Sequence, residues 1–304
     1  MVKCLVTGSD GLLGSALKRL LGKDHIFLTR KDCDLLNSQE VDAFFHGNRK
    51  KFDTVIHCAA RVGGVFANMN ANKEFFDQNY LINRNVLESS YKNQVENLVS
   101  VLSTCVFPDK VEYPLTADKI NLGPPHDSNK GYSYAKRLLL YQTEMFGKFL
   151  NKNWISVIPT NMYGENDYFN LDKGHLIPSL IRKAYEASVS GDDFLVWGDG
   201  SPLRQFVYSD DAAELILWAI ENWKQTNPFM LVSDQEFSIG SVANMIAVRL
   251  GIPENKIKYD ISKPKGQFRK KAHSDCPDYN FTSLEKGISK TIDWFVENRL
   301  SIRE

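Results

Sequence analysis

A glycine-rich turn directly after the first predicted strand is the feature that most constrains the fold of this chain. A strand is predicted over residues 3–7 and a helix from residue 12, and the turn between them comprises Gly8, Ser9, Asp10, Gly11, Leu12, Leu13 and Gly14. Glycines let a backbone turn tightly and approach a pyrophosphate, whose charge then lies at the helix N-terminus. The spacing is G-x-x-G-x-x-G rather than G-x-G-x-x-G, so a tight turn without a ligand is the alternative. Its position at the start of an alternating chain predicts a dinucleotide site.

Short apolar runs alternate with helical patterns through the first 160 residues. The predicted strands are residues 3–7, 25–29, 54–58, 98–102 and 154–159, and the predicted helices are residues 12–21, 38–49, 72–93 and 132–150. This alternation indicates a parallel sheet covered by helices on both faces. The predicted fold class is therefore α/β, with a doubly wound (Rossmann) sheet that binds ligands at the carboxyl ends of its strands.

The pattern loosens after residue 165. Residues 169–174 are predicted as a loop, and the later predicted elements are helices over 176–187, 212–222 and 239–250, a terminal helix ending near 298, and strands over 194–197, 205–208, 229–232 and 257–259. We expect a nucleotide-binding domain over residues 1–165, with a returning segment at about 205–233. Residues 166–204 and 234–304 would form a smaller α/β substrate domain. Asp210 and Asp211 are expected to cap the helix that begins at Ala212.

Composition indicates a soluble protein. The formal net charge is +0, which argues against binding nucleic acid or a membrane surface through bulk electrostatics. No apolar run approaches the length of a membrane span, and the N-terminus leads directly into a strand, so no signal peptide is expected. The five cysteines are scattered without a C-x-x-C pair, which favours a reduced, cytoplasmic protein with no metal site over a disulfide framework.

The end of the second predicted strand indicates which cofactor the turn takes. An acidic residue there would bind the ribose hydroxyls of NAD, whereas a basic one suits the extra phosphate of NADP. The chain has Thr29-Arg30-Lys31 at this position, so we expect NADP (NADPH), with Arg30 on the phosphate. Solvated surface cations are the alternative. Asp34 is expected either to contact the adenine amino group or to form a turn.

Tyr132 and Lys136 are four residues apart on a predicted helix, hence on one face. An ammonium near a phenol favours the phenolate, so we expect Lys136 to lower the pKa of Tyr132. Such a tyrosine can donate a proton to a carbonyl oxygen as hydride arrives at carbon. Ser103, at the end of its strand, would share that oxygen, and Lys136 would also hold the nicotinamide ribose. Two helix-surface residues are the alternative for the pattern alone; the nearby Tyr134 has only Leu138 at i+4.

These motifs, in this order, resemble the extended short-chain dehydrogenase/reductases, and most specifically the GDP-L-fucose synthase family. The resemblance runs through nearly the whole chain. The more specific stretches are Val62-Gly63-Gly64 and Ser103-Thr104-Cys105-Val106-Phe107-Pro108-Asp109-Lys110, and others are Gly123-Pro124-Pro125-His126, Gly131-Tyr132-Ser133-Tyr134-Ala135-Lys136, Pro159-Thr160-Asn161, Gly174-His175 and Val196-Trp197-Gly198. Two positions depart from the family pattern, and both fall in predicted loops. Glu165 follows Tyr163-Gly164 where the family usually has Pro, and Lys265 precedes Gly266-Gln267-Phe268 where the family often has Asp.

The resemblance implies a substrate, GDP-4-keto-6-deoxy-mannose, and an epimerisation at C3 and C5 before NADPH reduces C4. It implies that Cys105 and His175 form the acid/base pair for inversion, with pKa values near enough to neutrality for both roles; the sequence leaves open which is base and which is acid. A small buried hydrophobe and a helix-start residue are the respective alternatives.

The resemblance also implies binding residues and an assembly. Cofactor contacts are expected at Ala59, Ala60, Pro159, Asn161 and His175, besides the glycine turn, Tyr132 and Lys136. Substrate contacts are expected at Asn161, Lys183, Trp197, Arg204 and Lys270, with Arg204 on the diphosphate. Trp197 would stack on the base or pack in the core, and the cationic residues are otherwise a solvated face. A homodimer through the helices at 72–93 and 132–150 is expected.

Two other functions remain compatible with the sequence. One is another nucleotide-sugar epimerase or reductase with bound NAD, although a reductase without epimerisation would not need Cys105 with His175. The other is a redox-sensing module that holds NADP without turnover, and the Tyr132/Lys136 pair argues against it.

Overall fold

A parallel sheet forms the larger part of the computed structural model, which describes residues 2–171, 174–262 and 268–302. Within the described residues this sheet has six strands: β1 (Cys4–Thr7), β2 (Ile26–Leu28), β3 (Thr54–His57), β4 (Asn97–Val101), β5 (Asn153–Pro159) and β9 (Phe229–Leu231). They lie in the order β2-β1-β3-β4-β5-β9, and every neighbouring pair is parallel. The order reverses between β1 and β3, which is the switch point where ligands bind in doubly wound sheets.

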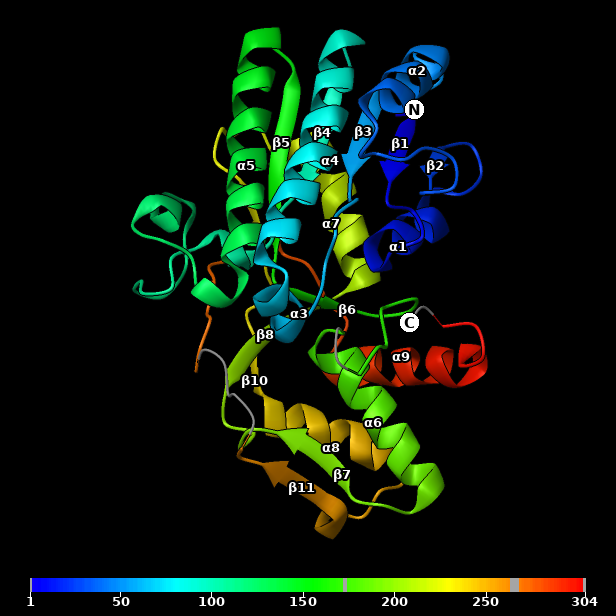
Figure 1. Cartoon of the computed structure of the whole chain (residues 1–304), viewed down its shortest axis with the longest axis vertical. Helices are drawn as coiled ribbons and strands as arrows, with labels where there is room; N and C mark the ends of the chain where they lie inside the picture. The colour runs from blue at the N-terminus through cyan, green and yellow to red at the C-terminus, as the bar shows by residue number, and fades with distance from the viewer. Residues whose placement is uncertain (1, 172–173, 263–267, 303–304) are drawn as a thin grey trace.

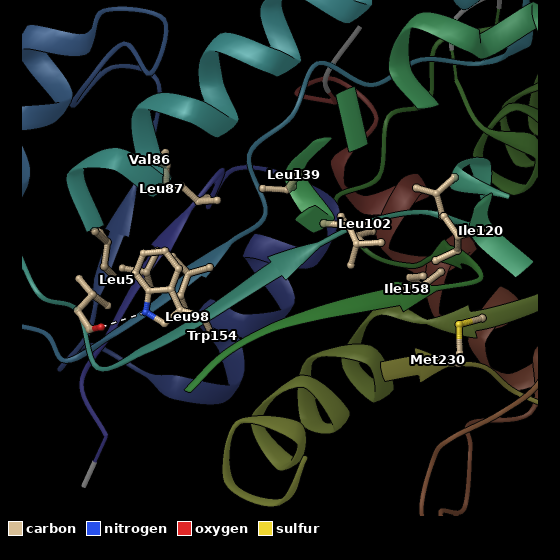
Figure 2. Packing of buried hydrophobic residues seen from close by; sticks show 14 of the residues in the cluster. Leu5, Val86, Leu87, Leu98, Leu102, Ile120, Leu139, Trp154, Ile158 and Met230 are labelled. Carbon is tan, nitrogen blue, oxygen red and sulfur yellow. Dashed lines mark hydrogen bonds between the residues drawn. The ribbon is translucent and has the colours of Figure 1, made fainter. Parts of the chain in front are cut away.

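Helices cover both faces of this sheet (Figure 1). One face packs against α2 (Ser38–Asn48), α4 (Asn72–Lys92) and α5 (Lys130–Leu150), and the other against α1 (Leu12–Leu21) and α7 (Ser209–Asn222). Figure 2 shows the first face, where Leu98 and Ile158 of the sheet lie beneath Leu87 of α4 and Leu139 of α5. Among the described helices, none is long and apolar enough to cross a membrane.

The apolar runs of the sequence follow from this two-sided burial. Leu5 packs in the cluster under α4 and α5, whereas its neighbours Cys4 and Val6 pack under α1 and α7. Successive side chains of a strand point to opposite faces, so a strand buried on both faces needs an unbroken apolar run. Trp154 closes the edge of the first cluster, and its indole nitrogen donates to the Val95 carbonyl at 3.0 Å (Figure 2).

Local sequence signals set the helix ends. Asn37 precedes α2, and its side-chain oxygen accepts from the backbone nitrogens of Gln39 and Glu40. Its amide nitrogen donates to Glu40 Oε1 at 2.8 Å, so each residue satisfies a polar group of the other, as in a capping box. Asn151 ends α5 in the left-handed conformation, with φ of 53°, a common helix terminator.

A smaller part lies at the carboxyl edge of the sheet and occupies the lower half of Figure 1. Its strands are β6 (Asn161–Tyr163), β8 (Leu203–Tyr208) and β10 (Glu236–Ser238) in one sheet, and β7 (Phe194–Trp197) and β11 (Ile257–Asp260) in another. Its helices are α6 (Leu176–Ser190), α8 (Ile239–Arg249) and α9 (Leu284–Asn298). They enclose a third apolar cluster that includes Tyr163, Phe169, Phe194 and Phe206.

The predicted α/β fold and every long predicted element are confirmed, usually within two residues. Seven short elements of the described residues were not predicted: α3 (Val65–Asn70), β6, β10 and four 3-10 helices. The predicted loop over 169–174 falls partly outside the described residues. The division into two domains near residue 165 stays a prediction; β8, assigned to the returning segment, pairs with β6 and β10 rather than with the large sheet.

The expected cap of α7 is wrong. The helix begins at Ser209, so Asp210 and Asp211 lie inside its first turn. Asp211 instead accepts hydrogen bonds from the backbone nitrogen and the hydroxyl of Thr282, both at 2.8 Å, and Asp210 pairs with Arg19 of α1. The two carboxylates therefore fasten α7 to its neighbours, because tertiary partners are in reach.

Gly287 of α9 gives a test of the packing within the smaller part, between α9 and β6. A β-carbon there would lie 2.1 Å from the hydroxyl oxygen of buried Tyr163. Gly287→Ala should therefore lower the free energy of unfolding by about 1–3 kcal/mol through overpacking, despite the better helix propensity of alanine. Urea unfolding measures it. Gly47→Ala in exposed α2 is the matched control, because nothing lies within 4 Å of its β-carbon, and it should raise stability by about 0.5–1 kcal/mol. Equal shifts in the two variants would contradict the packing argument.

Candidate active site

The glycine turn lies at the switch point and is packed so closely that only glycine fits. Gly8 has φ of +67°, and a β-carbon on it would lie 2.8 Å from Cα of Ala59, the second residue after β3. A β-carbon on Gly14 would lie 2.3 Å from the Gly8 carbonyl oxygen. Leu13 is buried in the core under α1, so only its backbone can face a ligand. The turn therefore offers bare backbone at the start of α1, as a pyrophosphate requires.

Two buried hydroxyls at this edge match a polar ligand. Among the described residues, Ser9 Oγ and Thr160 Oγ1 are buried without a hydrogen-bond partner, and they follow β1 and β5 respectively. Buried polar groups are nearly always paired, so these two call for a partner from outside the chain. Together with the glycine turn they fit a dinucleotide.

The loop after β2 favours a phosphate over a ribose diol. The nearest acidic residue, Asp32, accepts from the backbone nitrogen of Thr29 at 2.9 Å and from its hydroxyl at 2.6 Å, which lowers the pKa of Asp32. That carboxylate is thus used within the turn, while Arg30 is exposed on it. Asp34 Oδ1 accepts from the Leu36 backbone at 3.1 Å, the turn-forming alternative for this residue. The adenine contact of Asp34 stays a prediction.

The start of α5 is locked against the start of α4. The backbone nitrogen of Gly131 donates to Asn72 Oδ1 at 2.8 Å, and a β-carbon on Gly131 would lie 1.9 Å from the Asn72 carbonyl oxygen. No larger residue fits without moving the helix. Because Tyr132 is the next residue, this contact fixes where its side chain enters the site.

Lys136 is buried beneath Tyr132. Its side chain is 2% exposed, its Nζ donates to the Val101 carbonyl at 2.7 Å, and Nζ lies 5.8 Å from the Tyr132 ring centroid. Burial lowers the pKa of Lys136 to about 8. The expected lowering of the Tyr132 pKa by Lys136 is wrong: burial, and then the charge of Cys105, raise the pKa of Tyr132 above its ordinary value. A phenol that stays protonated at neutral pH is suited to donate a proton.

A buried hydrogen-bond chain connects the glycine turn to the helix of Tyr132 and Lys136. The Ala59 nitrogen donates to Thr7 Oγ1 at 3.2 Å, and Thr7 Oγ1 lies 2.8 Å from His57 Nδ1. His57 Nε2 lies 3.1 Å from Asn83 Oδ1, and the Asn83 amide donates to the Ala135 carbonyl at 3.4 Å. Burial first, and then Lys136, lower the pKa of His57 to about 3, so this imidazole is neutral. The chain thus joins β1, β3, α4 and α5 without adding charge near Lys136.

Ser103 and Cys105 share one turn after β4. A short 3-10 helix over Thr104–Val106 follows Ser103, whose Oγ accepts from the Cys105 backbone nitrogen at 3.3 Å. Cys105 Sγ accepts from the Asn129 amide at 3.0 Å and interacts electrostatically with Tyr132. The serine and tyrosine predicted for reduction therefore lie beside the cysteine predicted for inversion.

A second group of predicted residues adjoins Cys105. Lys270 interacts electrostatically with Cys105 and with Arg204, and burial chiefly lowers the pKa of both cations. Gln205, fully buried, positions this pair, because its side chain bonds both the nitrogen and the carbonyl of Ala272. Two half-buried cations held together repel each other, which favours a bound anion such as a diphosphate.

The remaining predicted residues lie around this centre. Lys183 Nζ of α6 lies 3.9 Å from the ring centroid of Trp197 on β7, and Trp197 is 41% exposed, so its ring is not core. Asn161 donates to the Gln205 carbonyl at 2.8 Å. His175 is an exposed residue at the start of α6, and within the described residues no hydrogen bond or ion pair joins it to Cys105. Lys265, Gly266 and Gln267 lie outside the described residues.

Sequence reasoning gave no role to four residues that build this site: Asn72, His57, Gln205 and Asn129. Each acts across a separation of at least 24 positions, to Gly131, Asn83, Ala272 and Cys105 respectively. No local spacing signals such contacts. The available hint was position, since Asn129 lies two residues before the Gly131-Tyr132 stretch and His57 ends a buried strand.

On this doubly wound sheet the structure combines a protonated tyrosine, a buried lysine and a glycine turn, the arrangement predicted for a tyrosine-dependent reductase. The model of the NAD dependent epimerase/dehydratase family matches residues 4–233. The probable GDP-L-fucose synthase of Drosophila melanogaster is 40% identical over 318 residues, covering 98% of each chain. The crystal structure of a GDP-L-fucose synthetase from Naegleria fowleri bound to NADP has a TM-score of 0.93 and 39% identity, covering 100% of this chain and 95% of that one. The chain belongs to the NAD dependent epimerase/dehydratase family and, within it, to the GDP-L-fucose synthases.

The lowered pKa of Lys136 predicts an alkaline limit for turnover. The amine carries its charge below pH 8 and loses it as the pH rises through about 8. If the ammonium holds the cofactor ribose, kcat/KM for NADPH should fall tenfold per pH unit above this value, since kcat/KM reports the free enzyme. The pKa of Tyr132 is raised above its ordinary value of about 10, so its ionisation would affect the pH profile only at a higher pH than that of Lys136. If kcat/KM for NADPH stayed constant up to pH 10, the role of the Lys136 ammonium would be contradicted. Any residual activity of Lys136→Arg should not fall above pH 8, because arginine keeps its charge.

Proposed function

We propose that this chain converts GDP-4-keto-6-deoxy-mannose to GDP-L-fucose, by epimerisation at C3 and C5 followed by NADPH-dependent reduction at C4. The observation that carries the proposal is the shared turn of Ser103 and Cys105, which brings a thiol beside the tyrosine of a reductase. One carbonyl oxygen held there would serve both reactions. Family membership supports the same activity.

For the reduction, the glycine turn would hold the pyrophosphate of NADPH, Arg30 its extra phosphate and Lys136 its nicotinamide ribose. Bound NADPH supplies a hydride to C4. Tyr132 donates its phenolic proton to the C4 oxygen, and Ser103 Oγ hydrogen-bonds the same oxygen. The raised pKa of Tyr132 keeps that proton in place until the oxygen becomes basic.

For the epimerisation, the C4 carbonyl acidifies the protons on C3 and C5. Cys105 removes such a proton, and His175 returns one from the opposite face. The Tyr132 hydroxyl stabilises the enolate oxygen formed in between. His175 is exposed at the start of α6, so this assignment requires the His175 side chain to move toward the bound sugar.

For substrate binding, Arg204 and Lys270 would hold the diphosphate. Both are half-buried, an anion would relieve their mutual repulsion, and Lys270 interacts with Cys105. Trp197, with Lys183 over its ring, offers an exposed aromatic face for the guanine. Asn161 would hydrogen-bond the sugar or the nicotinamide. Ala59, Ala60 and Pro159, which follow or end strands of the large sheet, would border the cofactor.

NADPH consumption with GDP-4-keto-6-deoxy-mannose tests this function, with product stereochemistry determined by NMR. GDP-L-fucose is the expected product. An uninverted 6-deoxy sugar would remove the epimerase half of the proposal, and the absence of turnover would favour a module that binds NADP without catalysis.

Two variants separate the halves of the reaction in the same assay. Tyr132→Phe should lose reduction by about 10²–10⁴-fold, the usual contribution of a general acid. Cys105→Ser should bind NADPH normally and lose inversion by a similar factor. Cys105→Ser that inverts both centres at the wild-type rate would contradict the assigned base.

We also propose that two copies of this chain associate through α5. Leu138, Met145 and Phe149 are 38%, 59% and 77% exposed and lie seven and four positions apart, hence on one face of α5. Leu81 is exposed on α4, the helix packed against α5. A second copy would cover this face by presenting the same residues across a two-fold axis.

Multi-angle light scattering of the purified chain tests the association. Wild-type protein should have the mass of a dimer, and Phe149→Glu should shift it to the monomer. Val189→Glu is the matched control, since Val189 is 71% exposed on α6, and it should remain dimeric. A monomeric wild type would contradict the proposal.

A further inference from the structure

Cys105 has a hydrogen-bond donor that the reaction scheme above does not use. Asn129, which immediately precedes α5, donates its amide N–H to Cys105 Sγ at 3.0 Å. A hydrogen bond to a charged form stabilises that form, so this contact favours the thiolate over the thiol. Only a thiolate is an effective base at this position.

The orientation of the Asn129 amide is fixed by its own partner. The hydroxyl of fully buried Ser133 donates to the Asn129 backbone carbonyl at 2.9 Å and shares the same proton with Asn129 Oδ1 at 3.4 Å. With its oxygen facing a hydroxyl, the Asn129 side chain presents nitrogen, and not oxygen, to the sulfur. Ser133 follows Tyr132 in the first turn of α5, so neighbouring residues of one turn contact Asn129 and enter the site respectively.

The charged and titratable groups facing Cys105 come from two other elements. Tyr132 of α5 lies beside the sulfur, and its phenol is neutral at working pH. Lys270, from the segment after β11, interacts attractively with Cys105 and is held near Asp109 and Arg204. Lys270 would be shared with the diphosphate site, whereas the Asn129 side chain bonds only Cys105 and Ser133 among the described residues.

We propose that Asn129, oriented by Ser133, is the positioning residue that maintains Cys105 as the thiolate base of epimerisation, with no part in hydride transfer. The inference rests on the function proposed above. The Cys105 thiolate takes the proton from the carbon next to the carbonyl, and the C–H electron pair becomes the enolate. Asn129 neither gains nor loses a proton, and Cys105 is a thiol after this step. The acid on the opposite face reprotonates carbon, and both groups return to their starting states by proton exchange with water.

Asn129→Asp tests the proposal, because it replaces the N–H donor with an oxygen of nearly the same size. With NADP⁺ bound, we expect deuterium from D2O to enter the substrate at C3 and C5 10- to 100-fold more slowly than in wild type. Iodoacetamide labelling of the Cys105 peptide, measured by mass spectrometry, should need a pH at least one unit higher for its half-maximal rate. NADPH affinity should stay within twofold, since Tyr132 and Lys136 are unchanged.

A second variant and two controls guard against a folding defect. Ser133→Ala keeps the Asn129 amide but removes its orienting partner, so both readouts should shift in the same direction by a smaller factor, about three- to tenfold in rate. Asn93→Asp and Ser90→Ala are matched controls. The Asn93 amide, directly after α4, and the Ser90 hydroxyl, on α4, each donate to a backbone carbonyl at 2.8 Å. Both readouts should match wild type in these variants.

Two outcomes would overturn the proposal. One is wild-type deuterium entry in Asn129→Asp; the other is slower entry with an unchanged labelling profile, which would make Asn129 a structural residue. Failure of the proposed function is distinguishable, because wild-type protein would then show no deuterium entry. The labelling comparison would in that case still decide whether Asn129 controls the state of Cys105.

Discussion

The burial of Lys136 is the constraint on which the rest of the site depends. An ammonium that is 2% exposed is stable only with a fixed acceptor, and the Val101 carbonyl at the end of β4 provides it. The groups behind it must then add no positive charge. His57 satisfies this condition, because burial and the nearby Lys136 ammonium lower its pKa to about 3. Its two ring nitrogens lie in the hydrogen-bond chain through Thr7 and Asn83, which also ties α5 to the glycine turn.

The start of α5 places two different groups beside Cys105, the Tyr132 phenol and the Asn129 amide. Burial keeps Tyr132 protonated as an acid, while Asn129, one turn earlier, presents an N–H to the sulfur of Cys105. One helix start thus serves both the Tyr132 phenol and the Cys105 sulfur within the same small volume. Gly131 makes this possible, because its close contact with Asn72 leaves no freedom in how the helix enters. The environments of the two groups differ, since burial acts on the phenol and an amide N–H contacts the sulfur.

The sequence predicts the fold well because periodicity and capping are local properties. The run Cys4-Leu5-Val6 and the helix patterns of α1, α4 and α5 have no competing interpretation, and the glycine spacing fixes where β1 meets α1. The motif residues Ser103, Cys105 and Tyr132 lie together as expected, and their roles stay predictions. Their protonation could not be predicted, since the raised pKa of Tyr132 arises from burial that no spacing encodes. Short elements such as β6 and β10 exist only through pairing with β8, and Asp211 was misassigned because its partner, Thr282, lies 71 residues away.

Glu165, where the sequence departs from the family pattern, lies in a loop and not among the predicted catalytic residues. Glu165 interacts with Arg19 of α1 at 3.5 Å and accepts from the Tyr208 hydroxyl at 3.4 Å. The next residue, Asn166, has φ of 60° and donates to the Asp10 carbonyl at 2.9 Å. A proline at 165 would restrict this segment by its ring. Here one ion pair and two hydrogen bonds hold the segment instead, and the bond to Asp10 joins it to the glycine turn. The substitution replaces local stiffness with tertiary contacts, so its effect falls on how the loop is anchored near the cofactor turn and not on the groups that move protons.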